Sequence, residues 1–62
     1  MKFKTETGRI INGDYIRNQE EIDNIRRRGF YGETPEIGKV SEYLGPSDGG
    51  FAVYNEDELE LI

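Results

Sequence analysis

The stretch from Ile37 to Ile62, IGKVSEYLGPSDGGFAVYNEDELELI, decides the expected fold. Residues 51–54 form a short run that favours a β-strand. The six residues directly before it, 45–50, comprise three glycines, a proline, a serine and an aspartate, which together favour a tight turn. Residues 58–61 alternate glutamate with leucine, as a half-buried strand does. The sequence therefore predicts two strands, and the spacing of Asn55 and Glu58 allows a single capped helical turn between them.

Residues 37–44 fit two different structures. As a helix, they would follow an N-cap at Thr34 and would place their apolar residues three and four positions apart, on one side. As a strand, they would pair across the turn with residues 51–54, which need a neighbour. Gly38 disfavours the helix, because glycine in a helix costs about 1 kcal/mol relative to alanine. We favour the strand and keep a second helix as the alternative.

The first residues of the chain carry two strand signals. Lys2–Thr7 alternates charged and less polar positions, which is the pattern of an exposed edge strand. Further on, Asn12-Gly13 separates two short runs of strand-forming residues. Asn-Gly accepts the positive φ values that a type I′ turn requires at both central positions. The sequence therefore predicts a β-hairpin over residues 9–16.

A helix is expected at about 19–28. Asn18 is a favourable N-cap, and Glu21 follows three residues later, as in a capping box. Gly29 fits the left-handed position at the end of a helix, and Phe30 would then pack back onto the last turn in a Schellman motif. Only two isoleucines inside the helix are apolar, so we expect it to cover a sheet along a narrow stripe. The residues after Gly29 would form a link.

The length of 62 residues limits the chain to one small domain over residues 1–62. The expected elements make an α+β domain, in which an antiparallel sheet of an N-terminal hairpin and C-terminal strands is covered by one short helix. The chain has no cysteine and no histidine, so it lacks thiolate ligands, disulfides and the usual general base. Because so short a chain hardly encloses a cleft, we expect no catalytic residue, cofactor, metal site or small-molecule substrate.

Nothing in the sequence indicates a membrane protein or a secreted one. No apolar run approaches the roughly 20 residues that a membrane-spanning helix needs. The N-terminal residues MKFKTET lack the apolar region of a secretory signal. We therefore expect a cytoplasmic protein without a membrane partner.

Charge is distributed unevenly along the chain. Residues 1–31 carry seven basic and five acidic side chains, a net charge of +2. Residues 32–62 carry one basic and eight acidic side chains, a net charge of −7, which gives the formal total of −5. If the second half packs as one unit, it presents an acidic face. Such a face keeps a small domain soluble, and it also suits a basic partner.

The predicted function is non-enzymatic protein binding by this acidic half. A groove that neutralises phosphates also attracts carboxylates held at similar density, so a basic, nucleic-acid-handling protein is the expected partner. The module would inhibit or modulate that protein by mimicking nucleic acid, as accessory proteins of phages or mobile elements do. Two tyrosines would serve as amphipathic anchors amid the charge. The expected partner-binding residues are Glu42, Tyr43, Asp48, Tyr54, Glu56, Asp57, Glu58 and Glu60.

Two other binding modes are open. The protein would be a minor subunit or assembly protein if the edge strand at Lys2–Thr7 completed a partner's sheet. Alternatively, Arg26–Arg28 would contact nucleic acid directly. Three arginines at a helix C-terminus already complement the helix dipole, and a net charge of −5 disfavours a nucleic-acid duplex over most of the surface. We therefore rank direct nucleic-acid binding last.

The segments GKVSEYLGPSDGG, FAVY and EDELELI together resemble the later strands of small barrels of the Src-homology-three type. In those barrels a hairpin with a glycine-rich turn leads to a short helical turn and a last strand. The resemblance covers about 26 residues and includes no diagnostic motif. It implies that local order of elements, and it implies no function.

Overall fold

The computed structural model describes residues 1–62 and shows a small α+β domain with mostly antiparallel sheets, which confirms the expected fold class. Its elements in chain order are β1 (Lys2–Lys4), β2 (Ile10–Asn12), β3 (Asp14–Tyr15), α1 (Gln19–Arg28), β4 (Phe30–Gly32), β5 (Val40–Gly45), η1 (Pro46–Asp48), β6 (Gly50–Tyr54), η2 (Glu56–Glu58) and β7 (Glu60–Leu61). Both η elements are 3-10 helices. None of the helices has the length and the apolar composition of a membrane-spanning helix.

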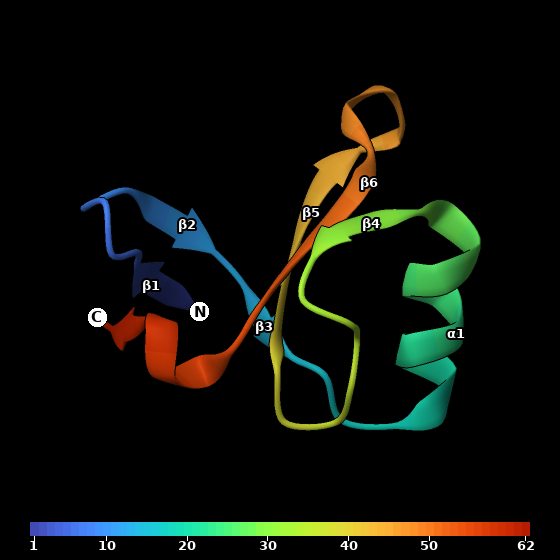
Figure 1. Cartoon of the computed structure of the whole chain (residues 1–62), viewed down its shortest axis with the longest axis horizontal. Coiled ribbons are helices and arrows are strands. Elements are labelled where there is room, and N and C mark those ends of the chain that lie inside the picture. The colour runs from blue at the N-terminus through green and yellow to red at the C-terminus, as the bar shows by residue number, and fades with distance from the viewer.

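The strands form two sheets (Figure 1). The three-stranded sheet has the order β2-β1-β7 and lies near both termini, and the four-stranded sheet has the order β3-β5-β6-β4. Every pairing is antiparallel except that of β4 with β6, which is parallel. Helix α1 lies on the other side of the four-stranded sheet from the three-stranded one (Figure 1). The molecule is therefore built in three layers.

Two small core clusters hold these layers together. One lies under α1 and consists of Ile16, Ile22, Ile25 and Val53. The other lies between the two sheets and consists of Phe3, Ile11 and Val40, with Tyr15, Tyr54 and Leu59 packed against it. Neighbouring residues of a strand point to opposite faces, so β6 sends Val53 to the first cluster and Tyr54 to the second.

The structure confirms α1 at Gln19–Arg28, and it differs from the prediction in the capping contacts. Asn18 is the N-cap, and its side-chain oxygen accepts a hydrogen bond from the backbone N–H of Glu21 at 3.0 Å. The Glu21 carboxylate turns back to the backbone N–H of Arg17 instead of that of Asn18. At the other end, Gly29 has φ 102° and ψ 150°, which is an extended conformation with positive φ. The expected Schellman contact of Phe30 is wrong, because the chain continues straight into β4.

The predicted hairpin over residues 9–16 is wrong, although an N-terminal hairpin exists. Strand β2 pairs with β1, and β3 pairs with β5 in the other sheet. Gly13 does not adopt the positive φ of a type I′ turn. Instead its Cα faces the core, where an added Cβ would lie 2.7 Å from Cγ1 of Val40. Asn12-Gly13 is therefore the crossing between sheets, which lets Ile11 and Ile16 enter different core clusters.

Lys2–Thr7 is not an edge strand. Strand β1 ends at Lys4, lies between β2 and β7, and forms hydrogen bonds on both sides. Phe3 at its centre is 1% exposed. Thr5 then begins a turn in which its carbonyl accepts the N–H of Gly8. A partner's strand therefore has no free edge to join at β1, and the open edges belong to β2, β7, β3 and β4.

The second half contains the strand that we favoured. Residues 40–45 form β5, which pairs antiparallel with β6 around η1, so the helix alternative for 37–44 is wrong. Gly38 has φ +96° in the turn before β5, a value that a helix does not allow. The η2 turn is also as predicted, since Asn55 N–H donates to Oε1 of Glu58 at 2.9 Å. The order of hairpin, helical turn and last strand that the barrel resemblance implied is present.

Candidate partner-binding surface

The eight residues expected to bind a partner lie in separate places. Asp48 is in η1 at the tip of the β5–β6 hairpin, while η2 and β7 follow the opposite end of β6. Glu42 and Tyr43 are neighbours on β5, so their side chains point to opposite faces of the sheet. Tyr43 packs against Phe51 on the α1 side, with ring centroids 5.0 Å apart. The second half of the chain therefore does not form one continuous acidic face.

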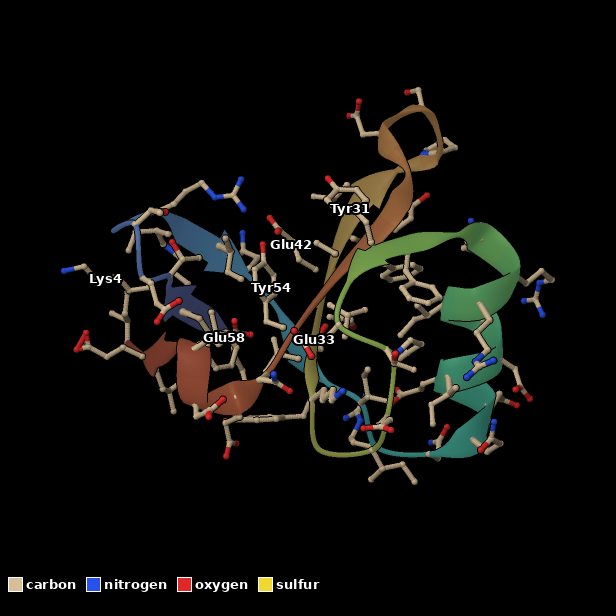
Figure 2. All side chains as sticks on the ribbon, viewed as in Figure 1. Lys4, Tyr31, Glu33, Glu42, Tyr54 and Glu58 are labelled. Carbon is tan, nitrogen blue, oxygen red and sulfur yellow. The ribbon has the colours of Figure 1, made fainter.

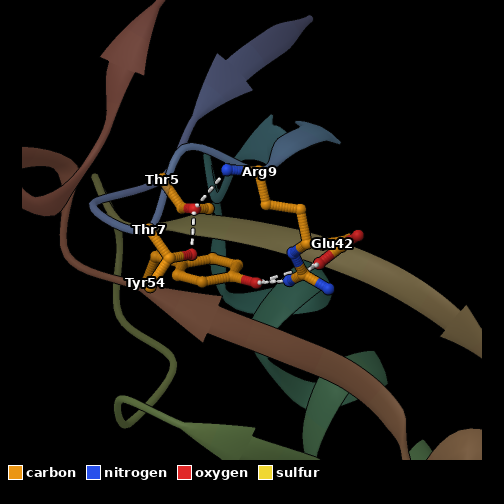
Figure 3. Close-up of polar contacts among 5 residues, drawn as sticks. All are labelled: Thr5, Thr7, Arg9, Glu42 and Tyr54. Atoms are coloured by element: carbon orange, nitrogen blue, oxygen red, sulfur yellow. Dashed lines mark hydrogen bonds and ion pairs between the residues drawn. The ribbon is translucent and has the colours of Figure 1, made fainter.

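Glu42 and Tyr54 meet in a hydrogen-bonded network at the junction of the two sheets (Figure 3). The Tyr54 hydroxyl donates to Oε1 of Glu42 at 3.0 Å and accepts from Nη2 of Arg9 at 2.9 Å. Arg9 also lies 3.6 Å from the Glu42 carboxylate, which is 16% exposed. This pairing neutralises the charge of Glu42. The network positions Tyr54 and ties β6 to the segment between β1 and β2.

The turn between β1 and β2 is fixed by side-chain hydrogen bonds (Figure 3). Oγ1 of Thr5 accepts the backbone N–H of Arg9 at 3.1 Å and lies 3.0 Å from Oγ1 of Thr7. Because Thr5 and Thr7 hold the turn, Glu6 between them has a defined place on the surface. That place is beside η2, since β1 pairs with β7.

Two shallow hollows of about 270 and 280 Å³ lie side by side between this turn and η2. Both are lined by Thr5, Glu6, Glu58 and Leu59. The first is completed by Thr7, Arg9 and Tyr54, and the second by Lys4, Asp57 and Glu60. Figure 2 shows Lys4, Glu58, Tyr54 and Glu42 on the side of the molecule away from α1. We call the carboxylates of Glu6, Asp57, Glu58 and Glu60 the acidic surface.

None of the four carboxylates in the acidic surface forms an ion pair. Elsewhere in the second half, Lys39 pairs with Glu36 at 3.0 Å and with Glu33 at 3.9 Å. Lys4, the cross-strand partner of Glu60, is the one basic residue that lines the second hollow. The surface therefore keeps a net negative charge in a defined geometry. No group of three Asp or Glu side chains is arranged to hold a metal ion.

Sequence reasoning missed Glu6 and placed Glu56 differently. Glu6 lies in the half of the chain with net positive charge, and only the pairing of β1 with β7 brings it to η2. Glu56 instead lies close enough to Tyr15 to shift the pKa of its hydroxyl. A side-chain hydrogen bond to the Glu56 carboxylate is the main cause that raises the pKa of the Tyr15 hydroxyl.

The Tyr54 network makes the stability of the folded state fall at alkaline pH. Burial, followed by the hydrogen bond to Glu42, raises the pKa of Tyr54 above its ordinary value near 10. The folded state therefore holds this proton more tightly than the unfolded state, so its stabilising effect is complete below about pH 10 and is lost as the pH rises. We expect the free energy of unfolding, measured by urea denaturation at increasing pH, to fall less in Tyr54→Phe than in wild type.

Tyr31→Phe is the matched control, because this variant also loses one tyrosine hydroxyl and Tyr31 is 55% exposed. This variant should retain the wild-type fall in stability at alkaline pH. A fall in Tyr54→Phe as steep as that of wild type would show that the network has no such effect.

The fold and the acidic surface define a small α+β domain with a polar, shallow surface region. No family model, curated protein or solved structure matches this chain. Its function must therefore be argued from its own residues.

Proposed function

We propose that this protein is a non-enzymatic binding module whose acidic surface docks onto a basic protein. The observation that supports this proposal is that four carboxylates without ion pairs converge from three segments: the β1–β2 turn, η2 and β7. Acidic residues that serve only solubility act wherever they lie on the surface, so they do not have to be close together. Elsewhere in the molecule the carboxylates either pair with lysine or arginine, as Glu21, Glu36 and Glu42 do, or do not share a hollow with three others.

The partner we propose is a nucleic-acid-handling protein. Such proteins carry a groove of lysines and arginines that neutralises phosphates, and the groove attracts other anions by the same field. The module would occupy that groove and so inhibit or modulate the partner. Tyr54 and Leu59, which line the first hollow, supply half-buried apolar contact beside the charges. Attraction between opposite charges mainly accelerates association, so binding should weaken as salt increases.

Charge reversal tests this function. In the variant Glu6→Lys, Asp57→Lys, Glu60→Lys, we expect affinity for the partner to fall by about a hundredfold or more, because like charges facing each other cost several kcal/mol. Glu58 is left intact because its carboxylate caps η2. The measurement is quantitative capture from nuclease-treated lysate of the native host at low and high salt, followed by binding assays with the captured protein.

The control variant is Glu20→Lys, Asp23→Lys, Asp48→Lys. It changes the net charge by the same amount as the test variant, but its substitutions lie on α1 and η1. It should capture the same basic protein as wild type. If both variants bind equally, or if the captured protein is retained at high salt, the acidic surface is not the interface. Direct nucleic-acid binding would instead give a gel shift that disappears in Arg26→Ala, Arg27→Ala, Arg28→Ala.

A further inference from the structure

The three exposed aromatic residues lie at one corner of the four-stranded sheet. They are Phe30, Tyr31 and Tyr43, which are 38%, 55% and 51% exposed. The register pairs Tyr43 with Phe51 and Phe51 with Phe30, so three aromatic rings form a row across β5, β6 and β4. Tyr31 is paired with Ala52 in the next row, on the opposite face of the sheet. Aromatic side chains therefore flank the end of this sheet on both faces.

Strand β4 has an open edge. It is the last strand of its sheet, and all three of its residues are exposed. Phe51 N–H donates to the carbonyl of Gly29 at 3.0 Å, and Glu33 N–H donates to that of Val53 at 2.9 Å. In a parallel ladder with these two bonds, the backbone N–H and C=O groups of Tyr31 point to β6. Those of Phe30 and Gly32 point outward. No lysine, proline or bulge protects this edge.

Positive charge lies at the end of α1 that leads into β4. Arg26–Arg28 form the last turn of α1, and Gly29 alone separates them from β4. None of the three arginines forms an ion pair, and two of them, Arg27 and Arg28, donate to Oδ1 of Asn24. The guanidinium carbon of Arg28 lies 5.9 Å from the centroid of the Tyr43 ring. Tyrosine and arginine side chains carry much of the binding energy in protein interfaces, so this combination is typical of a docking surface.

We infer that the β4 edge is a second interaction surface, which takes an extended acidic segment of another protein as an added strand. The outward N–H and C=O groups of Phe30 and Gly32 would bond to the main chain of that segment. Alternate side chains of the added strand would pack against Phe30 on one face and Tyr31 on the other. Its carboxylates would pair with Arg26–Arg28.

A peptide strand fits this corner better than nucleic acid does. Phosphates accept hydrogen bonds from the outward N–H groups of a sheet edge but leave its C=O groups unpaired, whereas an added strand satisfies both. The net charge of −5 also repels a long polyanion, while a short acidic segment meets only the arginines nearby. The β4 edge and the acidic surface lie on different sheets, so each surface is tested without the other.

The test uses a displayed library of extended peptides with glutamate or aspartate at alternate positions. Selection on the full chain should enrich binders, and the best binder is then labelled and measured by fluorescence anisotropy. Chemical synthesis of the chain allows the Phe30 nitrogen to be methylated, which removes the outward N–H and keeps the ring. We expect this change to weaken binding about tenfold or more, and Arg26→Gln, Arg27→Gln, Arg28→Gln to do the same.

Two control proteins test whether the peptide binds at the β4 edge. Methylation at the Ile37 nitrogen, in the exposed turn before β5, and the variant Glu6→Lys, Asp57→Lys, Glu60→Lys should both leave peptide affinity unchanged. Failure of the library to enrich binders would overturn the inference, and so would binding that survives methylation of Phe30. Displacement of the peptide by a thymidine oligonucleotide of equal charge would assign the corner to single-stranded nucleic acid instead.

Discussion

Replacing Gly32 by alanine is expected to destabilise the protein by about 3 kcal/mol or more. Gly32 has φ +95°, and a Cβ there would penetrate the carbonyl oxygen of Val53 on the neighbouring strand. Strain from a positive φ costs roughly 1–3 kcal/mol, and forcing atoms into a packed site adds a similar amount. A domain of this length has a total stability of roughly 3–9 kcal/mol. Urea denaturation should therefore show a much lower midpoint for Gly32→Ala than for the wild type.

Gly38→Ala is the matched control for this experiment. Gly38 has φ +96°, nearly the same as Gly32, but an added Cβ meets no atom within 4 Å. Its cost should be the backbone strain alone, about 1 kcal/mol. The difference between the two variants measures the close approach of β4 to β6. Equal losses of stability would mean that β4 does not lie as close to β6 as this structure shows.

Replacing Phe3 by alanine should cost about 3–5 kcal/mol, the usual range for a buried phenylalanine. Phe3 is 1% exposed, packs with Ile11 and Val40, and contacts the Tyr15 ring edge-on at a centroid distance of 5.7 Å. It is the largest fully buried side chain between the two sheets, so no neighbour fills the space it leaves. We expect the three-stranded sheet to separate and the midpoint of urea denaturation to fall strongly.

The same variant should also abolish binding through the acidic surface. Glu6 follows β1 directly and Glu60 lies in β7, so both lose their positions when this sheet separates. The control is Ile10→Ala on the adjacent strand, where the side chain is 52% exposed. Its effect on stability should stay within about 0.5 kcal/mol. Wild-type stability in Phe3→Ala would contradict a core between the sheets.

The candidate surface was only partly predictable from the sequence. Asp57, Glu58 and Glu60 are close in the chain, so any local structure would keep them together. Asp48 is separated from them because β6 lies between, and four steps along a strand span about 13 Å. Glu6 joins the group through the register that places Lys4 opposite Glu60. The net charge of each half of the chain gives no information about that register.

The β4 edge had no signal that sequence reasoning used. Three residues between a helix and a loop are too few to show periodicity, so Phe30 and Tyr31 were expected to be part of a link. Their parallel pairing with β6 follows from the extended conformation of Gly29, which directs the chain along β6 instead of back onto α1. The functions of both surfaces remain predictions, which the binding experiments test.

The local elements of this protein follow from short-range patterns in its sequence. The Asn18 cap, the Gly45–Gly50 turn and the capped turn at Asn55–Glu58 each depend on residues within about four positions of one another. The pairing of the strands, in contrast, depends on long-range packing. Ile11 and Ile16 are buried in different core clusters, and burying both required the chain to cross between sheets at Gly13. The free energy that selects this arrangement comes from contacts between residues far apart in the chain, which local patterns do not record.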